Sequence, residues 1–185
     1  MDADFTLIRR MKQGEADAFD TFVRKYYDDM LRYCTFHSAH REDAEDLTQE
    51  TFVRFFAHLS DYRHLGKAKN YLYTIAANLC RNAWARQQAI ATDEDTLDAL
   101  AGSTDNEDAQ TIHLLLEQAL DALAPELREV IILHYYQGLK QREIAEILAI
   151  GLPLVKYRLR QAKIQLRALI GEEETDDELR RTLES

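Results

Sequence analysis

The sequence contains few residues that interrupt helices. Among its 185 residues there are only 6 Gly and 2 Pro, so long helices can form. No apolar run approaches the roughly 18 residues needed to cross a membrane, and the first residues are acidic where a signal peptide would be basic. We therefore expect a cytoplasmic protein without a membrane span.

Cysteine is also scarce, and no catalytic motif is present. Cys34 and Cys80 lack a C-x-x-C spacing, which argues against a disulfide framework and a cysteine zinc site and predicts two reduced, buried thiols. Cys34, His37 and His40 lack a fourth zinc ligand, so we predict no metal site. There is no glycine-rich phosphate loop, nucleophile elbow or zinc-hydrolase helix motif. The sequence therefore predicts a protein that is not an enzyme and has no cofactor.

Charge of one sign is missing from parts of this acidic chain, whose formal net charge is -10. Residues 91–111 hold 7 acidic and no basic side chains, and residues 171–185 hold 7 acidic and 2 basic ones. Residues 1–90 hold 13 of each sign, and residues 112–170 hold 8 basic and 6 acidic ones. Like-charge repulsion and low hydrophobicity are typical of linkers and tails. We predict domains at 1–90 and 112–170, an acidic flexible linker at 91–111 and an acidic tail at 171–185.

Apolar residues recur at steps of three and four in both predicted domains. In the first domain this pattern includes Phe22, Tyr26 and Met30, and a further helix is expected from about residue 67 to 88. In the second domain we expect helices at 114–122, 125–136, 139–149 and 153–170. There is no convincing strand alternation and no internal repeat. The predicted fold class is all-α, with two small helical domains.

The last two predicted helices have the spacing of a helix-turn-helix. Residues 151–170 hold five basic side chains and no acidic one. The second helix has an apolar stripe of Val155, Leu159, Ala162, Leu166 and Leu169. Its outward face then carries Lys156, Tyr157, Arg160, Gln161 and Ile164. Such a face can reach phosphates and base edges in the major groove of DNA, although a solvated basic face explains the same pattern equally well.

The motifs along the chain resemble those of bacterial sigma factors. The string DAEDLTQETFVRFF, residues 43–56, resembles the segment that docks on the RNA polymerase core. The string KNYLYTIAANLCRNAWAR, residues 69–86, resembles the promoter-melting segment, and LDALAPELREVIILHYYQGLKQREIAEILAI, residues 120–150, resembles the carboxy-terminal domain. No third domain fits between the two blocks. The chain is similar to an extracytoplasmic-function sigma factor over about residues 5–170.

This resemblance implies a promoter-specificity subunit of RNA polymerase. The implied partners are the polymerase core, promoter DNA and an anti-sigma factor. Two other functions fit parts of the pattern: a helix-turn-helix regulator that works without the polymerase, and a helical adaptor that binds only proteins. Copurification with core polymerase would favour the sigma function over both.

The docking segment places three polar residues on one helix face. Asp46, Gln49 and Glu50 stand at i, i+3 and i+4, so they can together meet a basic coiled coil on the polymerase. The resemblance places the polymerase contact at these residues. A solvated acidic face is the alternative, and a metal site is disfavoured because no histidine completes a ligand set.

Two further sets of residues are predicted to contact DNA. Residues 63–90 hold five basic side chains and no acidic one, interleaved with aromatic residues, as single-strand binding requires. By resemblance, contacts to the minus-10 element are assigned to Lys67, Lys69, Asn78, Arg81, Asn82 and Arg86. Contacts to the minus-35 element are assigned to Gln141, Arg142, Lys156, Tyr157, Arg158, Arg160, Gln161 and Lys163. Tyr71 and Trp84 fit a buried core and a base-stacking platform equally well.

The turn of the predicted helix-turn-helix departs from the usual form of the family. Family members commonly have glycine where Ala149 stands and proline or serine where Gly151 stands. We expect Gly151-Leu152-Pro153 to move the turn chemistry along by two residues. Lys140 occupies a position where a capping Ser or Thr would be preferred.

Overall fold

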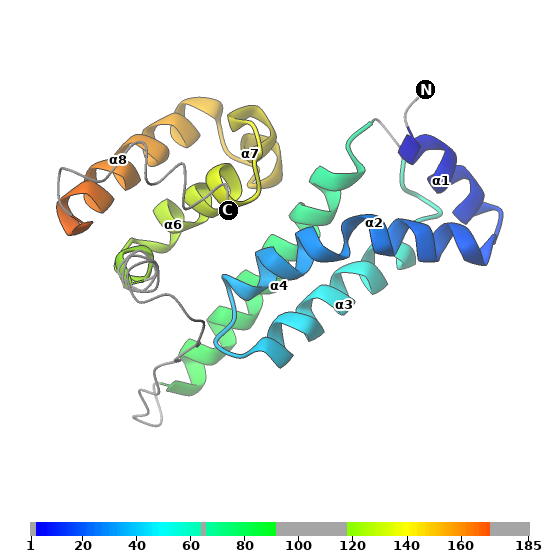
Figure 1. Cartoon of the computed structure of the whole chain (residues 1–185), viewed down its shortest axis with the longest axis horizontal. Helices are drawn as coiled ribbons and strands as arrows, with labels where there is room; N and C mark the ends of the chain where they lie inside the picture. Colours follow the sequence, from blue (N-terminus) through cyan, green and yellow to red (C-terminus); the bar gives the residue numbers. More distant parts are fainter. Residues whose placement is uncertain (1–2, 64–65, 92–117, 171–185) are drawn as a thin grey trace, which may run out of the picture. The chain divides into compact units, whose positions relative to one another are not determined.

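The chain forms two compact helical units, which meet in sequence between Asp98 and Ala99. The computed structural model describes residues 3–63, 66–91 and 118–170, and it contains no strand within these ranges (Figure 1). The first unit contains α1 (Ala3–Lys12), α2 (Ala16–Thr35), α3 (Arg41–Ala57) and α4 (Ala68–Ala91). The second contains α6 (Pro125–Ile131), η1 (Ile132–Tyr136), α7 (Gln141–Ile147) and α8 (Leu152–Ile170). The all-α prediction is confirmed.

The predicted acidic linker, apart from residue 91, and the predicted acidic tail lie outside the described residues. Of the helix expected at 114–122, only residues 118–122 are described, and residues 118–121 are helical. None of the helices in the described ranges is both long and apolar enough to cross a lipid bilayer.

The core of the first unit is an aromatic cluster between α2, α3 and α4. The rings of Phe22 and Phe55, both fully buried, stack with centroids 4.8 Å apart. Tyr33 of α2 meets Tyr73 of α4 edge-on at 5.4 Å, and burial raises the pKa of Tyr73 above its ordinary value. These contacts hold α4 against α2 and α3 and fix which of its faces points to solvent.

Both cysteines belong to this core and are free thiols, as predicted. Cys34 of α2 and Cys80 of α4 are buried, and a hydrogen bond from the Cys80 side chain lowers the pKa of the Cys34 thiol. The side chain of Cys34 is directed into the core. No cluster of three potential ligand side chains occurs in the described ranges.

In the second unit, four consecutive residues, Val130 to Leu133, are all buried. A regular α-helix cannot bury four in a row on one face, because each residue turns by about 100°. Here α6 runs into the π-helical turn η1, closed by a hydrogen bond from the Gln137 amide to the Ile132 carbonyl at 3.1 Å. The π turn widens the helix and lets this segment contact α7 and α8 together.

The turn between α7 and α8 lies at Ala149, so the prediction that it moves to Gly151-Leu152-Pro153 is wrong. Ala149 has a φ of 53°, whereas Gly151 is not in the left-handed region. The amides of Ala149 and Ile150 donate to the carbonyls of Glu146 at 3.2 Å and Ala145 at 3.0 Å. This pattern is a Schellman ending of α7, which needs a left-handed residue at Ala149. The Gly151 carbonyl instead accepts the first amide bonds of α8.

The start of α7 is held by Glu143, whose carboxylate accepts a hydrogen bond from the Lys140 amide at 2.7 Å. The Lys140 side chain supplies no capping bond to α7, in line with the expectation that a Ser or Thr would suit this position better. On α8, four residues of the predicted apolar stripe are buried, but the fifth, Leu169, is 55% exposed, because it lies beyond the last buried residue, Leu166.

We expect the substitution Ala149→Gly to raise the free energy of unfolding of the second unit by about 0.5–1 kcal/mol. Glycine removes the clash of Cβ in the left-handed region, and this gain exceeds the entropy that glycine adds to the unfolded chain. Amide hydrogen exchange in α7 and α8 measures the effect, because the one tryptophan, Trp84, lies in the first unit. Ala145→Gly, inside α7, is the control and should cost about 1 kcal/mol. Equal destabilisation by both variants would contradict the strain at Ala149.

Candidate nucleic-acid interface

The outer face of α3 carries the three residues predicted to dock on the polymerase. The helix buries Thr48, Thr51 and Phe55 among others, and this leaves Asp46 and Gln49 exposed. Neither makes a side-chain hydrogen bond or ion pair with any described residue. Glu50 is half-buried and accepts a hydrogen bond from Arg54 Nε at 2.7 Å. The structure therefore places all three on one accessible face.

Sequence analysis missed Val53, which is 59% exposed on the same face of α3. Val53 stands seven residues after Asp46, two helical turns along, so the two side chains lie in one row. The sequence could have indicated this, because an apolar residue seven positions after Asp46 must lie on the same helix face as the predicted docking residues. An exposed valine on this face could supply apolar contact area to a bound protein.

The exposed face of α4 brings together four of the six residues predicted to contact the minus-10 element. Asn78 and Asn82 stand one turn apart, and both are exposed. Arg81 donates to Asn78 Oδ1 at 3.0 Å, and Arg86 Nε donates to the Asn82 carbonyl at 3.2 Å. These arginines flank the two amides, so the face combines positive charge with groups that can pair with base edges.

The two lysines at the start of α4 are placed differently. Lys67 lies directly before the helix and is exposed. Lys69 is nine residues from Asn78, about 180° around the helix, and its Nζ forms an ion pair with Asp29 of α2 at 2.7 Å. The structure therefore does not bring Lys69 to the face that carries the asparagines.

The structure distinguishes the two aromatic residues that the sequence left open. Tyr71 is half-buried and packs against the core: its ring stacks on Tyr62 with centroids 5.1 Å apart, and its centroid lies 5.8 Å from that of Phe55. Trp84 is 46% exposed. It follows the buried Cys80 by one helical turn and so continues the core-facing side of α4.

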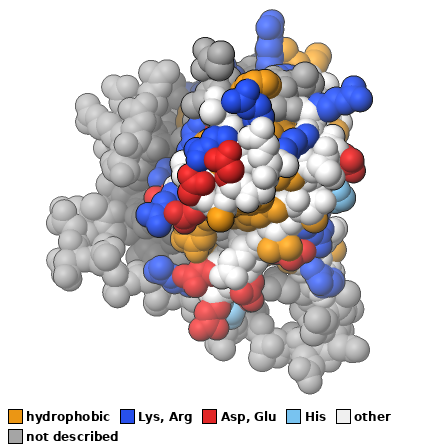
Figure 2. All heavy atoms as spheres, turned by 90° about the vertical axis from the view of Figure 1, so that its right-hand side faces the viewer, with side chains coloured by type: hydrophobic (Ala, Val, Ile, Leu, Met, Phe, Trp, Pro, Cys, Tyr) orange, Lys and Arg blue, Asp and Glu red, His pale blue; other side chains and the backbone are white. Residues whose placement is uncertain are grey.

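Several charged side chains on the described surface are paired with a neighbour of opposite charge. Figure 2 shows acidic and basic side chains beside one another on one face of the molecule, with hydrophobic side chains between them. Exposed ion pairs such as Arg24 with Asp20 at 2.9 Å and Arg41 with Glu45 at 2.8 Å join neighbouring turns of one helix. The pKa of the Arg41 guanidinium is raised by its hydrogen bond to Glu45.

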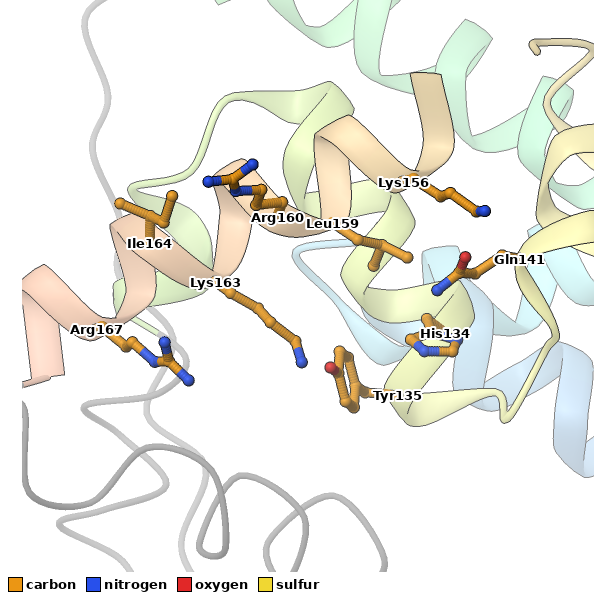
Figure 3. A pocket seen from close by; sticks show the side chains of 9 residues that line it. All are labelled: His134, Tyr135, Gln141, Lys156, Leu159, Arg160, Lys163, Ile164 and Arg167. Carbon is orange, nitrogen blue, oxygen red and sulfur yellow. The ribbon is translucent and has the colours of Figure 1, made fainter. Parts of the chain in front are cut away.

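A groove of about 540 Å³ along α8 differs, because four of the residues that line it are Lys or Arg and none is acidic. Lys156, Arg160, Lys163 and Arg167 stand at i, i+4, i+7 and i+11, a single row along the helix. Figure 3 shows Lys156 near one end of the groove and Arg167 at the other. Lys156, Arg160 and Lys163 form no ion pair with a carboxylate in the described part of the chain.

The other wall of the groove comes from η1 and α7. Lys163 extends toward the ring of Tyr135, and its Nζ lies 5.2 Å from the ring centroid (Figure 3), a cation–π contact. His134 Nδ1 lies 2.8 Å from the Leu139 carbonyl and therefore donates to it, which fixes the ring in the wall. Gln141, a predicted DNA contact, also lines this groove. Tyr135 and His134 were missed because the π turn that turns them toward α8 leaves no clear periodicity in the sequence.

The remaining residues predicted to contact the minus-35 element divide between faces of the second unit. Tyr157 is 58% exposed and adjoins the basic row, and Arg142 is exposed at the start of α7. Gln161 is half-buried. Arg158 is half-buried and lies about 160° from Lys156 around the helix. The structure therefore groups Lys156, Arg160 and Lys163 with Gln141 but does not bring Arg158 to them.

Comparison with known proteins accounts for both units. Residues 22–90 match sigma-70 region 2, and residues 113–166 match sigma-70 region 4. The ECF RNA polymerase sigma factor SigE of Mycolicibacterium smegmatis is 31% identical over 174 residues, which cover 89% of this chain and 66% of SigE. The RNA polymerase sigma factor YlaC of Bacillus subtilis is 31% identical over 157 residues, which cover 82% of this chain and 91% of YlaC.

Solved structures have the same fold. CnrH, in complex with the cytosolic domain of CnrY, matches with a TM-score of 0.71 at 23% identity over 93% of this chain and 99% of CnrH. The sigma factor RpoE of Bartonella quintana, in complex with the anti-sigma factor NepR, matches with a TM-score of 0.68 at 22% identity over 82% of this chain and 96% of RpoE. From its two matched regions and its relatives in sequence, the chain belongs to the extracytoplasmic-function (ECF) sigma factors of bacterial RNA polymerase.

Proposed function

We propose that the two units of this sigma subunit divide promoter recognition between them. The first unit binds the polymerase core through α3 and opens the minus-10 element with α4. The second unit reads the minus-35 element as duplex with α8. The observation that carries this proposal is the basic row of α8, in which three exposed or half-buried cations have no described carboxylate partner.

The dimensions of α8 suit a DNA groove. The major groove is about 12 Å wide and admits one helix. Lys156 and Arg160 lie in the first half of α8, and amino-terminal residues of a recognition helix are those that contact base edges. Tyr157 lies between these two residues in the sequence and is exposed. Arg158 is not assigned a base contact, because it lies on another side of the helix.

The exposed face of α4 fits a separated strand better than a duplex. Asn78 and Asn82 offer amide groups one turn apart, and an amide can form two hydrogen bonds with the edge of an unstacked base. Arg81 and Arg86 supply the positive charge that tracks the phosphates. This arrangement supports capture of a flipped minus-10 base.

The face of α3 supports docking on the polymerase core. Asp46, Gln49 and Glu50 present acidic and polar groups beside the exposed Val53. Such a surface complements a basic helical partner, with the carboxylates steering the encounter and the apolar residue supplying buried area.

The proposed function also sets the cellular context. Because RNA polymerase acts in the cytoplasm, the chain works there, and the chemistry of phosphodiester formation belongs to the polymerase and not to this subunit. CnrH and RpoE were each solved with a protein partner, which for RpoE is an anti-sigma factor. We extend this to the present chain and propose that an anti-sigma factor holds it until it is needed.

A transcription assay tests the proposal. Purified core polymerase and a library of genomic fragments should give discrete run-off transcripts only when the chain is added. The starts of these transcripts should share sequences near minus 35 and minus 10. Stable binding to duplex DNA, without transcripts and without copurification with the core, would instead favour a regulator that works without the polymerase. The match to region 2 in addition to the helix-turn-helix argues against that alternative.

A further inference from the structure

The basic row along α8 carries an electrostatic cost in the free protein. Like charges three or four residues apart on a helix destabilise it by a few tenths of a kcal/mol per pair. Lys156, Arg160 and Lys163 gain no compensating ion pair from the described residues of their own unit. An acidic ligand would remove this repulsion, and DNA is absent whenever the subunit is not on a promoter.

The chain itself supplies acidic groups immediately after α8. The helix ends at Ile170, three residues beyond Arg167, the last residue of the basic row. Residues 171–185 hold 7 acidic and 2 basic side chains, a net charge of -5. Six of these acids fall within the eight residues from Glu172 to Leu179.

The length of this segment is sufficient to return along the groove. Lys156 and Arg167 are eleven positions apart along α8, a distance of about 17 Å at 1.5 Å per residue. The 15 residues from 171 to 185 can extend to about 50 Å. A chain that reverses direction after Ile170 can therefore reach every cation of the row.

The groove also offers an apolar contact. Ile164 lines it and is 49% exposed, and the acidic segment contains Leu179 and Leu183. An apolar contact between Ile164 and one of these leucines would add to the ionic attraction. Salt would weaken this contact less than it weakens the ion pairs.

We infer that residues 171–185 occupy the basic groove of α8 in the free subunit and compete there with duplex DNA. The competition with DNA rests on the proposed function, whereas occupation of the groove does not. The acidic linker is a weaker candidate, because it joins the second unit at the opposite end of its sequence. Tethering supplies an effective concentration of about 1 mM, so an intrinsic Kd of about 0.1 mM would keep the groove about 90% occupied.

The first test measures occupation without DNA. A fluorescent peptide of residues 171–185 is titrated with the full-length chain and with a chain that ends at Ile170. At low salt we expect binding to the shortened chain with a Kd of about 0.1 mM and about tenfold weaker binding to the full-length chain, whose groove is already occupied. Equal affinity for both chains, or no binding to the shortened chain, would overturn the inference.

Charge variants of the shortened chain locate the peptide. The groove variant carries Lys156→Gln, Arg160→Gln and Lys163→Gln, and it should lose most of the peptide affinity. The matched control removes three cations outside the groove through Lys140→Gln, Arg142→Gln and Arg158→Gln, and it should bind nearly as the parent does. An equal loss in both variants would indicate nonspecific attraction and would refute a site in the groove.

The second test measures competition with DNA in the full-length chain. Neutralising the tail with Glu172→Gln, Glu173→Gln, Glu174→Gln and Asp176→Asn should tighten binding to a minus-35 duplex about tenfold at low salt and little at high salt. The control neutralises four acids of the linker through Asp93→Asn, Glu94→Gln, Asp95→Asn and Asp98→Asn and should have little effect. A gain from the linker variant alone would overturn the assignment to the tail. If neither the parent chain nor its variants bound duplex DNA, the proposed function would be wrong. The peptide test would still decide whether the tail occupies the groove.

Discussion

Reversing the charge of Asp46 and Glu50 to lysine is expected to weaken binding to core RNA polymerase by about 100-fold, or about 3 kcal/mol. Both side chains lie on the accessible face of α3, and the double variant replaces attraction to a basic partner with repulsion. The measurement is competition with a fluorescently labelled parent chain for a fixed amount of core enzyme. The loss should shrink as salt is raised, because exposed charges are screened.

A matched control separates the docking face from net charge. Asp28→Lys with Asp61→Lys changes the charge by the same amount at two exposed sites outside α3, and it should leave core binding nearly unchanged. Losing the exposed ion pair between Glu50 and Arg54 costs the helix less than about 1 kcal/mol. Circular dichroism should therefore be unaltered. If both double variants bound the core as the parent does, α3 would not be the docking element.

Replacing Lys156 or Arg160 with alanine is expected to reduce transcription from promoters that depend on their minus-35 element by about 5- to 150-fold. This range corresponds to about 1–3 kcal/mol, the value of a lost base contact. Replacing Asn78 with alanine should instead change the preference for one base of the minus-10 element, because its amide lies on the exposed face of α4. Transcription from a set of promoters with single-base changes in each element measures both effects.

The control for the second unit is Arg158→Ala. It removes the same side chain as Arg160→Ala, but from a side of α8 that faces away from the groove, so it should have a much smaller effect. Equal loss from Arg158→Ala and Arg160→Ala would mean that total charge matters and the groove face does not. If the variants of α4 and α8 merely lowered transcription equally from every promoter, the two units would not divide recognition between them.

Much of the fold follows from local rules that the sequence expresses directly. Phe22, Tyr26 and Met30 recur at helical spacing, and all three are buried in α2. Within one helix the angle between two residues depends only on their separation, so Asp46, Gln49 and Glu50 share a face wherever α3 lies. The order of sigma motifs along the chain likewise identified the family without any tertiary information.

Tertiary structure decided which residues of similar type and spacing are exposed to solvent, because their exposure depends on where the neighbouring helices end. Tyr71 and Trp84 look alike in sequence, yet Tyr71 packs against Tyr62 while Trp84 is exposed. Lys69 resembles the other basic residues of its segment in sequence, but its side chain forms an ion pair with Asp29 of α2. Leu169 continues an apolar stripe but lies past the last buried residue of α8. Each outcome rests on a contact between segments far apart in the chain.

Backbone geometry was the other element that residue patterns did not reveal. Glycine at 151 suggested a shifted turn, but the hydrogen bonds that end α7 require the left-handed residue at Ala149, whatever its side chain. The π turn η1 likewise has no sequence signature, yet it turns Tyr135 and His134 toward α8 and so forms one wall of the basic groove. The sequence by itself determined the helices, their order and their charge, whereas the packing of η1, α7 and α8 decided which of the cations share one groove, because a groove requires two elements side by side.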